Sequence, residues 1–223
     1  MILLTLSIDE LLKAVQPALY ETLIMVGISS VGTVLLGLPL GVLLHICQPQ
    51  GMAPNAVLSK VLGAVVNATR SVPYAILMLS LIPFTRWLVG TSVGPFAACV
   101  SLIIAAVPFF ARLVESSLRE VHPGKVDAAH AMGSTRMQTI TKVLLPEALP
   151  SLVAAVTTTV VALTGYSAMA GLIGGGGLGR LAYNYGFQRF DSLVMIVIVI
   201  VLLGMVQLFQ VLGDTVIRRV DHR

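Results

Sequence analysis

Charged residues are scarce in this chain, because only 11% of its 223 residues are Asp, Glu, Lys or Arg. A soluble domain of this length needs roughly a quarter of its residues charged to cover its surface with polar groups. Hydrophobic residues account for 57% of the chain, so much of the surface must face a solvent less polar than water. The composition excludes an ordinary soluble domain and predicts an all-α integral membrane protein.

Cysteine is also scarce, and clusters of basic residues are missing. Cys47 and Cys99 lie in or beside apolar runs without metal-binding neighbours, which excludes a disulfide framework or a zinc site. The net charge of +4 comes with no run of five basic residues, so nucleic acid is not an expected partner. Residues 1–17 lack the basic start and the cleavage site of a signal peptide, and we expect a short interfacial helix there.

Motifs for phosphate binding and catalysis are missing as well. No G-x-x-x-x-G-K-[ST] motif occurs, so the chain cannot cradle ATP phosphates by that route. The stretch 165–169 lacks the second glycine of a nucleophile elbow. All four histidines fall in predicted loops or at the end of a span, where none is placed as a base within the membrane. We therefore expect no catalytic residue, no bound cofactor and no metal, which means that the chain itself is not an enzyme.

Long apolar runs are what the chain does contain. A helix needs about 20 mostly apolar residues to cross a bilayer, and five stretches meet this condition. The second stretch would be about 46 Å long as one helix, which exceeds a hydrocarbon core of about 30 Å. It must either project beyond the membrane or break around Arg70-Ser71-Val72-Pro73. The expected spans, within a single transmembrane domain covering 1–223, are approximately 20–46, 57–88, 93–113, 150–171 and 192–214.

Basic residues are distributed unevenly between the two sides of this layout. Cytoplasmic loops of membrane proteins carry an excess of Lys and Arg. Ten of the 14 basic residues lie after the third span, in the C-terminal tail, or between the first span and the middle of the second. We therefore expect the N-terminus outside and the C-terminus in the cytoplasm. Arg70 should lie near the cytoplasmic face or point into the bundle, because an arginine facing lipid at the membrane centre costs at least about 2.5 kcal/mol.

The longest connection, 119–149, is expected on the cytoplasmic side. Pro123 suits the start of a helix, the alanines after it favour a helix, and Gly133 can end one in the left-handed conformation. The result would be a short helix with a small-residue face, which another protein's backbone can approach closely. A second amphipathic stretch, Met137–Leu145, precedes Pro146. This pattern is typical of an element that passes on a mechanical push.

Within this connection the residues resemble the EAA signature of bacterial ABC importer permeases, E-A-A-x3-G-x9-I-x-L-P. The chain carries Asp127-Ala128-Ala129, then Gly133, then Val143-Leu144-Leu145-Pro146, with every spacing preserved. Asp127 replaces the glutamate and Val143 replaces the isoleucine. The resemblance implies a cytoplasmic coupling loop, 119–149, that a partner ATPase grips. The implied coupling residues are Asp127, Ala128, Ala129, Gly133, Val143, Leu145 and Pro146.

Over residues 20–219 the chain is similar to the methionine-family importer permeases, a compact five-span type. The passages that carry this likeness are Arg70-Ser71-Val72-Pro73, Ile82-Pro83-Phe84-Thr85-Arg86, Val89-Gly90-Thr91-Ser92, Leu144-Leu145-Pro146-Glu147-Ala148-Leu149-Pro150 and Gly165-Tyr166-Ser167-Ala168-Met169-Ala170-Gly171.

The family likeness carries implications for fold, partners and cofactors. It implies a type I ABC importer permease fold in the bacterial inner membrane, with methionine as the favoured substrate. The implied partners are a second permease copy, two cytoplasmic ABC ATPase subunits and an extracytoplasmic substrate-binding protein. ATP and Mg would be used by the ATPase subunits and not bound by this chain.

The fourth span follows the coupling loop directly, so it is the best candidate to line a translocation path. Most of its hydroxyl groups can bond the carbonyl one turn back in their own helix. Tyr166, Ser167 and Met169 are the candidate path and gate residues, because Met169 near the outer end could narrow a pore with a flexible apolar side chain.

Two glycine patterns leave alternatives open. The stretch 174–179 formally matches G-x-G-x-x-G, but it follows a membrane span and not a strand, so we expect a flexible external turn. Gly37 and Gly41 form a G-x-x-x-G pair that permits close helix packing, either within one subunit or across a dimer. The candidate hinge residues are Gly174, Gly175, Gly176 and Gly177.

Other functions are weighed against the importer permease. The same kind of permease could carry another amino acid. A secondary transporter with broken helices would account for Pro39, Pro73 and Pro83, but the odd span count, the lack of an internal repeat and the lack of carboxylates inside spans argue against it. A non-transporting membrane scaffold would explain the spans and not the loop signature.

Overall fold

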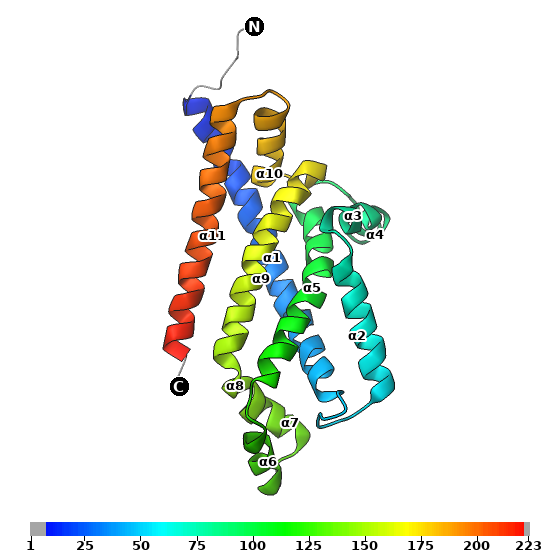
Figure 1. Ribbon diagram of the computed structural model, residues 1–223. Helices are drawn as coiled ribbons and strands as arrows, with labels where there is room; N and C mark the ends of the chain where they lie inside the picture. The colour runs from blue at the N-terminus through cyan, green and yellow to red at the C-terminus, as the bar shows by residue number, and fades with distance from the viewer. Residues whose placement is uncertain (1–7, 221–223) are drawn as a thin grey trace. The chain divides into compact units, whose positions relative to one another are not determined.

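A computed structural model describes residues 8–220, with side chains from Glu10 onward. Within that range the chain is helical and contains no β-strand, as its composition predicts. Each of the longest helices drawn in Figure 1 contains a stretch long and apolar enough to cross a membrane. These helices are α1 (Ile8–Ile46), α5 (Pro95–Arg119), α9 (Leu149–Ala170) and α11 (Ser192–Val220).

The second expected span is broken, which is the second of the two alternatives that its length left open. α2 (Ala56–Ser71) and α3 (Tyr74–Ser80) meet at a sharp bend, and α4 (Ile82–Val89) follows. Pro73 has no amide hydrogen and disfavours the helical conformation of Val72 before it, which explains why the helix stops here. The described residues therefore hold four candidate spans, or five if α2 and α3 count as one broken span.

The helix ends differ from the expected spans in two places. α1 already begins at Ile8 and runs without a break through Pro17, so the described part of 1–17 is not a separate interfacial helix, and residues 1–7 lie outside the description. α5 continues to Arg119, six residues beyond the expected end at 113. The carboxylate of Glu115 therefore lies on a helix that was expected to have no acidic residue.

Contacts divide the chain into two compact units. Unit 1 takes in the described residues of Met1–Gly32 with Val72–Ala105 and Val160–Gln210. Unit 2 takes in Thr33–Ser71 and Ala106–Thr159 with the described residues of Val211–Arg223. That the whole chain acts as one transmembrane domain stays a prediction.

In unit 1 the first part of α1 packs against α10 (Gly177–Leu181) and the start of α11. α10 lies between the π-helical turns η2 (Gly171–Gly175) and η3 (Ala182–Phe187). The buried side chains of this core come from positions that recur every three or four residues along each helix, which is the spacing of one helix face. They are Leu11, Val15, Ala18, Leu178, Leu181, Val194 and Ile198.

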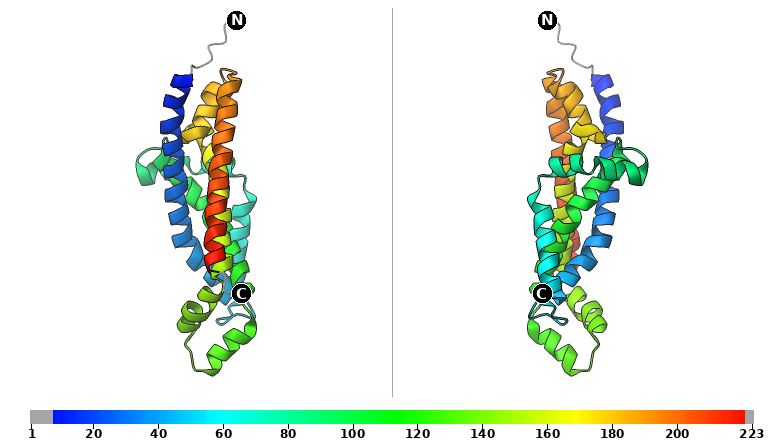
Figure 2. Two further views of the ribbon diagram at one scale, coloured as in Figure 1. Left: turned by 90° about the vertical axis from the view of Figure 1, so that its left-hand side faces the viewer. Right: turned by 90° about the vertical axis from the view of Figure 1, so that its right-hand side faces the viewer.

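In unit 2 the connection after α5 folds into short helices. These are α6 (Pro123–Ala131), α7 (Arg136–Thr139), the π-helical turn η1 (Ile140–Leu144) and α8 (Leu145–Glu147). Figures 1 and 2 show α6 and α7 projecting beyond the neighbouring ends of α5 and α9. The predicted short helix ahead of Gly133 and the predicted helical stretch ahead of Pro146 are both confirmed.

Gly37 and Gly41 serve packing within the chain, which resolves one alternative. A Cβ at Gly37 would lie 2.8 Å from the Phe110 ring, and one at Gly41 would lie 2.5 Å from the Val114 side chain and 2.6 Å from the Ala111 carbonyl oxygen. Only glycine lets α1 approach α5 this closely. This contact sets the position of α5, from which the site described next extends.

Candidate functional site

The start of α6 is fixed by residues that the sequence places together. Pro123 occupies the first turn, where a missing amide hydrogen costs nothing. The side chain of His122 caps the helix, because its Nδ1 accepts a hydrogen bond from the Gly124 amide at 3.1 Å. The helix therefore begins at a defined residue after the turn that ends α5.

The end of α6 is a Schellman motif. Gly133 has φ +78°, the Ser134 amide donates to the Ala129 carbonyl at 3.1 Å, and the Gly133 amide donates to the His130 carbonyl at 2.9 Å. Glycine adopts this left-handed conformation without the steric cost that a Cβ brings. The sharp stop predicted at Gly133 is confirmed, and its reason is backbone geometry, since a Cβ there would meet no other atom within 4 Å.

α6 has one buried face and one exposed face. Ala129 is buried and Val126 packs against the core of unit 2. Asp127 and Ala128, on the other side, are exposed. Met132, at 83% exposure, is an apolar side chain left uncovered at the tip. The small side chain of Ala128 on this exposed face leaves the helix backbone open to close approach.

The segment after Gly133 restarts the helix. Thr135 and Gln138 form a capping box, in which the Gln138 amide donates to the Thr135 hydroxyl and the Thr135 amide donates to the Gln138 side chain. The pattern T-x-x-Q is a known helix-start signal that the sequence analysis did not use. Inside the following turn the Leu145 amide donates to the Ile140 carbonyl, five residues back. This wider π turn accommodates Pro146, which would otherwise clash with the carbonyl four residues back.

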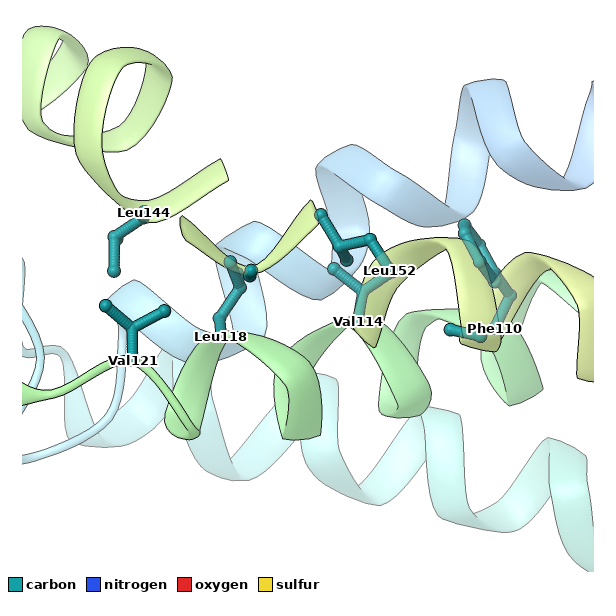
Figure 3. Close-up of a cluster of buried hydrophobic side chains, with 8 residues drawn as sticks. Phe110, Val114, Leu118, Val121, Leu144 and Leu152 are labelled. Atoms are coloured by element: carbon teal, nitrogen blue, oxygen red, sulfur yellow. The ribbon is translucent and has the colours of Figure 1, made fainter. Parts of the chain in front are cut away.

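A continuous apolar core joins this segment to α5 and α9. Figure 3 shows Leu144 facing Val121 and Leu118, with Val114, Leu152 and Phe110 continuing the row. Leu145 packs against the same core, Val143 is half-buried and Pro146 is exposed. Close-packed side chains transmit displacement with little compression. Val126 of α6 and Ile140 of η1 also pack against this core, which we call the coupling core. Its buried residues are Phe110, Val114, Leu118, Val121, Leu144, Ala148, Leu152 and Ala155.

One ion pair also ties α6 to α8. The Lys125 ammonium donates to the Glu147 carboxylate, and both side chains are partly exposed. Exposed pairs of this kind contribute little, about 0–1 kcal/mol. The coupling core therefore contributes more than this ion pair to holding the segment in place.

A cleft of about 480 Å³ lies beside α6 in unit 2. His45 and Gln48 line it from the end of α1 and the turn after it, Arg119 from α5, and Val126 and Asp127 from α6. The cleft combines polar and apolar lining. It lies along the edge between the buried and the exposed face of α6, where Val126 and Asp127 meet.

A buried polar cluster that the sequence did not reveal lies next to this cleft. Glu115 is 1% exposed, and its carboxylate accepts hydrogen bonds from Arg112, Arg119 and Gln48. Arg112 and Arg119 were interpreted only as charges that set the orientation. The signal that could have found the cluster is the spacing of Arg112, Glu115 and Arg119 by three and four residues, which places all three on one helix face.

The candidate gate residues lie on the part of α9 that belongs to unit 1. The Tyr166 ring stacks on Tyr74 of α3, with ring centroids 4.9 Å apart. Ser167 is buried, and its hydroxyl donates to the Thr164 carbonyl at 2.8 Å. Met169 is 37% exposed. Their role in a path or gate stays a prediction.

The threonines of α9 behave as expected for a helix interior. Thr157, Thr158, Thr159 and Thr164 each donate a hydrogen bond to the carbonyl four residues back. Their hydroxyls are thus satisfied within the helix. They need no ligand to explain them.

The glycine-rich stretch in unit 1 is held on both sides. Gly174, Gly176 and Gly177 have positive φ, as expected of a glycine turn. The Gly174 carbonyl accepts from the Gly94 amide at 2.9 Å, and the Gly177 amide donates to Glu21 at 2.6 Å. A Cβ at Gly175 would lie 2.8 Å from the Ala170 carbonyl oxygen. These contacts fix the turn in the described state, and its role as a hinge stays a prediction.

A family comparison assigns the chain. The sequence profile of the family described as binding-protein-dependent transport system inner membrane component matches residues 37–223. The chain belongs to this family. An inner-membrane component needs several apolar helices, which the described residues supply.

Individual relatives agree with the family. The chain is 52% identical over 206 residues to the probable D-methionine transport system permease protein MetI of Vibrio cholerae, covering 92% of each chain. It is 45% identical over 203 residues to the protein with the same description from Pasteurella multocida, covering 91% and 94%. It is also similar to a solved inward-facing structure of the MetNI methionine ABC transporter, with a TM-score of 0.95 and 44% identity over 97% of this chain and 100% of that one.

Proposed function

We propose that this chain is the permease subunit of an ATP-driven importer that carries methionine across the bacterial inner membrane. The observation that carries the proposal is α6: a helix with a defined start and a glycine stop, exposed on one face and joined on the other to α5 and α9. The chain has no phosphate-binding motif of its own. The energy for transport must then come from a partner.

The partner acts as a motor on α6. When two ATPase subunits bind ATP and close, they move α6, and the coupling core carries that movement to α5 and α9. Close-packed elements with two discrete arrangements convert such a push into a change of access. Hydrolysis of ATP with Mg in the partner returns the inward-open arrangement. The permease performs no bond chemistry and binds no cofactor.

The topology and assembly follow from the same proposal. The N-terminus lies outside, the C-terminus and the loop 119–149 lie in the cytoplasm, and two copies of the chain form the complex with two ATPase subunits. An extracytoplasmic binding protein delivers the substrate. The excess of Lys and Arg on the proposed cytoplasmic side supports this orientation.

The substrate assignment rests on the relatives, whose descriptions name D-methionine or methionine. Tyr166, Ser167 and Met169 line or gate the path in this proposal, and Gly174–Gly177 lets the outer end of α9 change its direction. Uptake of radiolabelled methionine by vesicles holding the whole complex, with a panel of competing amino acids, tests the choice. Competition by another amino acid at a lower concentration than methionine would reassign the substrate.

A substitution at Gly133 tests the docking role of α6. Gly133→Val places a β-branched residue at φ +78°, which such residues rarely adopt, so the end of α6 must change conformation. We expect the ATPase to co-purify with the parent chain in mild detergent and to be lost, by about tenfold or more, from Gly133→Val. Gly133→Asn is the matched control, because asparagine tolerates the left-handed conformation.

The broken helix at Pro73 favours one other function, a secondary transporter. ATPase co-purification and the energy source of uptake distinguish a secondary transporter from an importer permease. If no ATPase co-purifies with the parent chain and uptake follows an ion gradient, the secondary transporter replaces the importer permease. The buried Glu115 does not by itself favour that function, because two arginines already pair with it.

A further inference from the structure

The carboxylate of Glu115 is the most completely buried charge in unit 2 among the described residues. Arg112 donates to it at 2.5 Å and Arg119 donates to it at 2.5 Å. The Gln48 side-chain amide donates to it as well. A buried carboxylate is costly unless such partners satisfy it. All three partners must therefore keep their positions for the carboxylate to stay buried.

These partners come from separate parts of the chain. Gln48 lies in the connection after α1. Arg112 belongs to α5, and its second nitrogen donates to the side-chain oxygen of Asn67 on α2 at 3.1 Å. A single buried group thus joins α5 to the connection after α1 directly and to α2 through Arg112.

α2 is also held to α5 by apolar packing and by one cation–π contact. The only residue of α2 that is fully buried is Val66, which packs with Leu44 of α1 and Ala111 of α5. Val57 and Val65, on the same helix, are largely exposed. The Arg70 guanidinium of α2 also lies over the Phe109 ring of α5, 5.9 Å from its centroid. Apolar packing of α2 within unit 2 is thin, so the polar link through Arg112 acts beside this cation–π contact and Val66 in holding α2 to α5.

The same stretch of α5 carries the coupling core. Val114 and Leu118 flank Glu115 in the sequence and pack with Leu144 and Leu152. Movement of the 119–149 loop reaches α5 at these side chains. Glu115 lies at the point where that movement would pass on to α2.

We infer that Glu115 is a positioning residue that makes α2 and the connection after α1 move together with α5 when the coupling loop is displaced. The inference rests on the proposed function, because it concerns how ATPase movement becomes transport. Without the network, α5 would still follow the coupling loop and α2 would lag behind. ATP would then be hydrolysed with less transport.

Asn67→Ala tests this most sharply. Asn67 is exposed and uncharged, so its loss removes the polar link from Arg112 to α2 and leaves the Glu115 ion pairs intact. We expect unchanged assembly and melting temperature, with methionine uptake per ATP hydrolysed lowered by about two- to thirtyfold, the usual range for residues along a coupling route. The control is Ser71→Ala on the same helix, whose hydroxyl bonds only its own helix at the Asn67 carbonyl, and which should behave as the parent.

Glu115→Gln adds the second arm of the test. It should lower uptake per ATP hydrolysed by at least as much as Asn67→Ala, and combining the two should add nothing, because both act through one network. Parent-like uptake per ATP in Asn67→Ala overturns the inference, even if Glu115→Gln fails to assemble, since the cluster would then serve stability alone. If the parent complex shows no ATP-driven uptake, the proposed function itself is wrong. That outcome is distinct from parent-like coupling in Asn67→Ala, which overturns only this inference.

Discussion

At the scale of single residues, several glycines are fixed by contacts that no side chain can share. A Cβ at Gly179 would overlap the Ala168 carbonyl oxygen and lie 2.7 Å from the carbonyl carbon. Both atoms belong to the backbone of α9, which cannot move aside without breaking its helix. Gly27 of α1, in contrast, would place a Cβ in open space. The two glycines are therefore under different steric constraints.

The pair gives a direct prediction. Gly179→Ala should destabilise the permease by about 3 kcal/mol or more, because the overlap is with backbone atoms. Gly27→Ala, at an exposed helical position, should change stability by less than about 1 kcal/mol. Thermal unfolding of the detergent-solubilised chain measures both. Equal melting temperatures for the two variants would show that α10 does not approach α9 as described.

At the scale of elements, the start of α10 depends on α1 within unit 1. The hydroxyl of Thr22 accepts a hydrogen bond from the Leu178 amide at 2.9 Å and donates one to the Ala18 carbonyl at 2.9 Å. Thr22 is 1% exposed. Side-chain oxygens that cap a helix start satisfy amides that have no partner in their own helix.

Thr22→Val should therefore weaken the contact between α1 and α10. Valine keeps the shape of threonine and leaves the Leu178 amide without its acceptor, which costs about 1–3 kcal/mol. The melting temperature should fall, and hydrogen exchange at the Leu178 amide should become faster. Thr158→Val is the control, because the exposed Thr158 hydroxyl bonds only the Ala154 carbonyl of its own helix. A Leu178 amide that exchanges at the parent rate in Thr22→Val would contradict the capping role.

The elements also show what periodicity and composition can predict. Apolar length located the four long helices, and Pro123 and Gly133 located α6, because local rules govern those features. The π turn ahead of Pro146 and the extension of α5 to Arg119 were missed. Both depend on what the rest of the fold packs against the helix, which spacing along the chain does not contain.

At the scale of the whole molecule, one part of the candidate site could be predicted from the sequence and another part could not. The exposed face of α6 was predictable, because the spacing of Asp127, Ala128 and Gly133 is local. The Glu115 cluster was not, because its partners Gln48 and Asn67 are brought in from other helices. The sequence showed Arg112 and Arg119 only as part of a positive-inside bias. Tertiary contacts gave them a second role.

The orientation of α6 is the claim on which the account of the whole molecule depends. The direct test uses a chain whose native cysteines are replaced by alanine, with Met132→Cys at the tip of α6 or Phe187→Cys in η3, both at exposed positions. A membrane-impermeant maleimide should label Phe187→Cys on intact cells and Met132→Cys only in inside-out vesicles, where co-expressed ATPase should protect it. Labelling of Met132→Cys on intact cells would put α6 outside the cell and contradict the account.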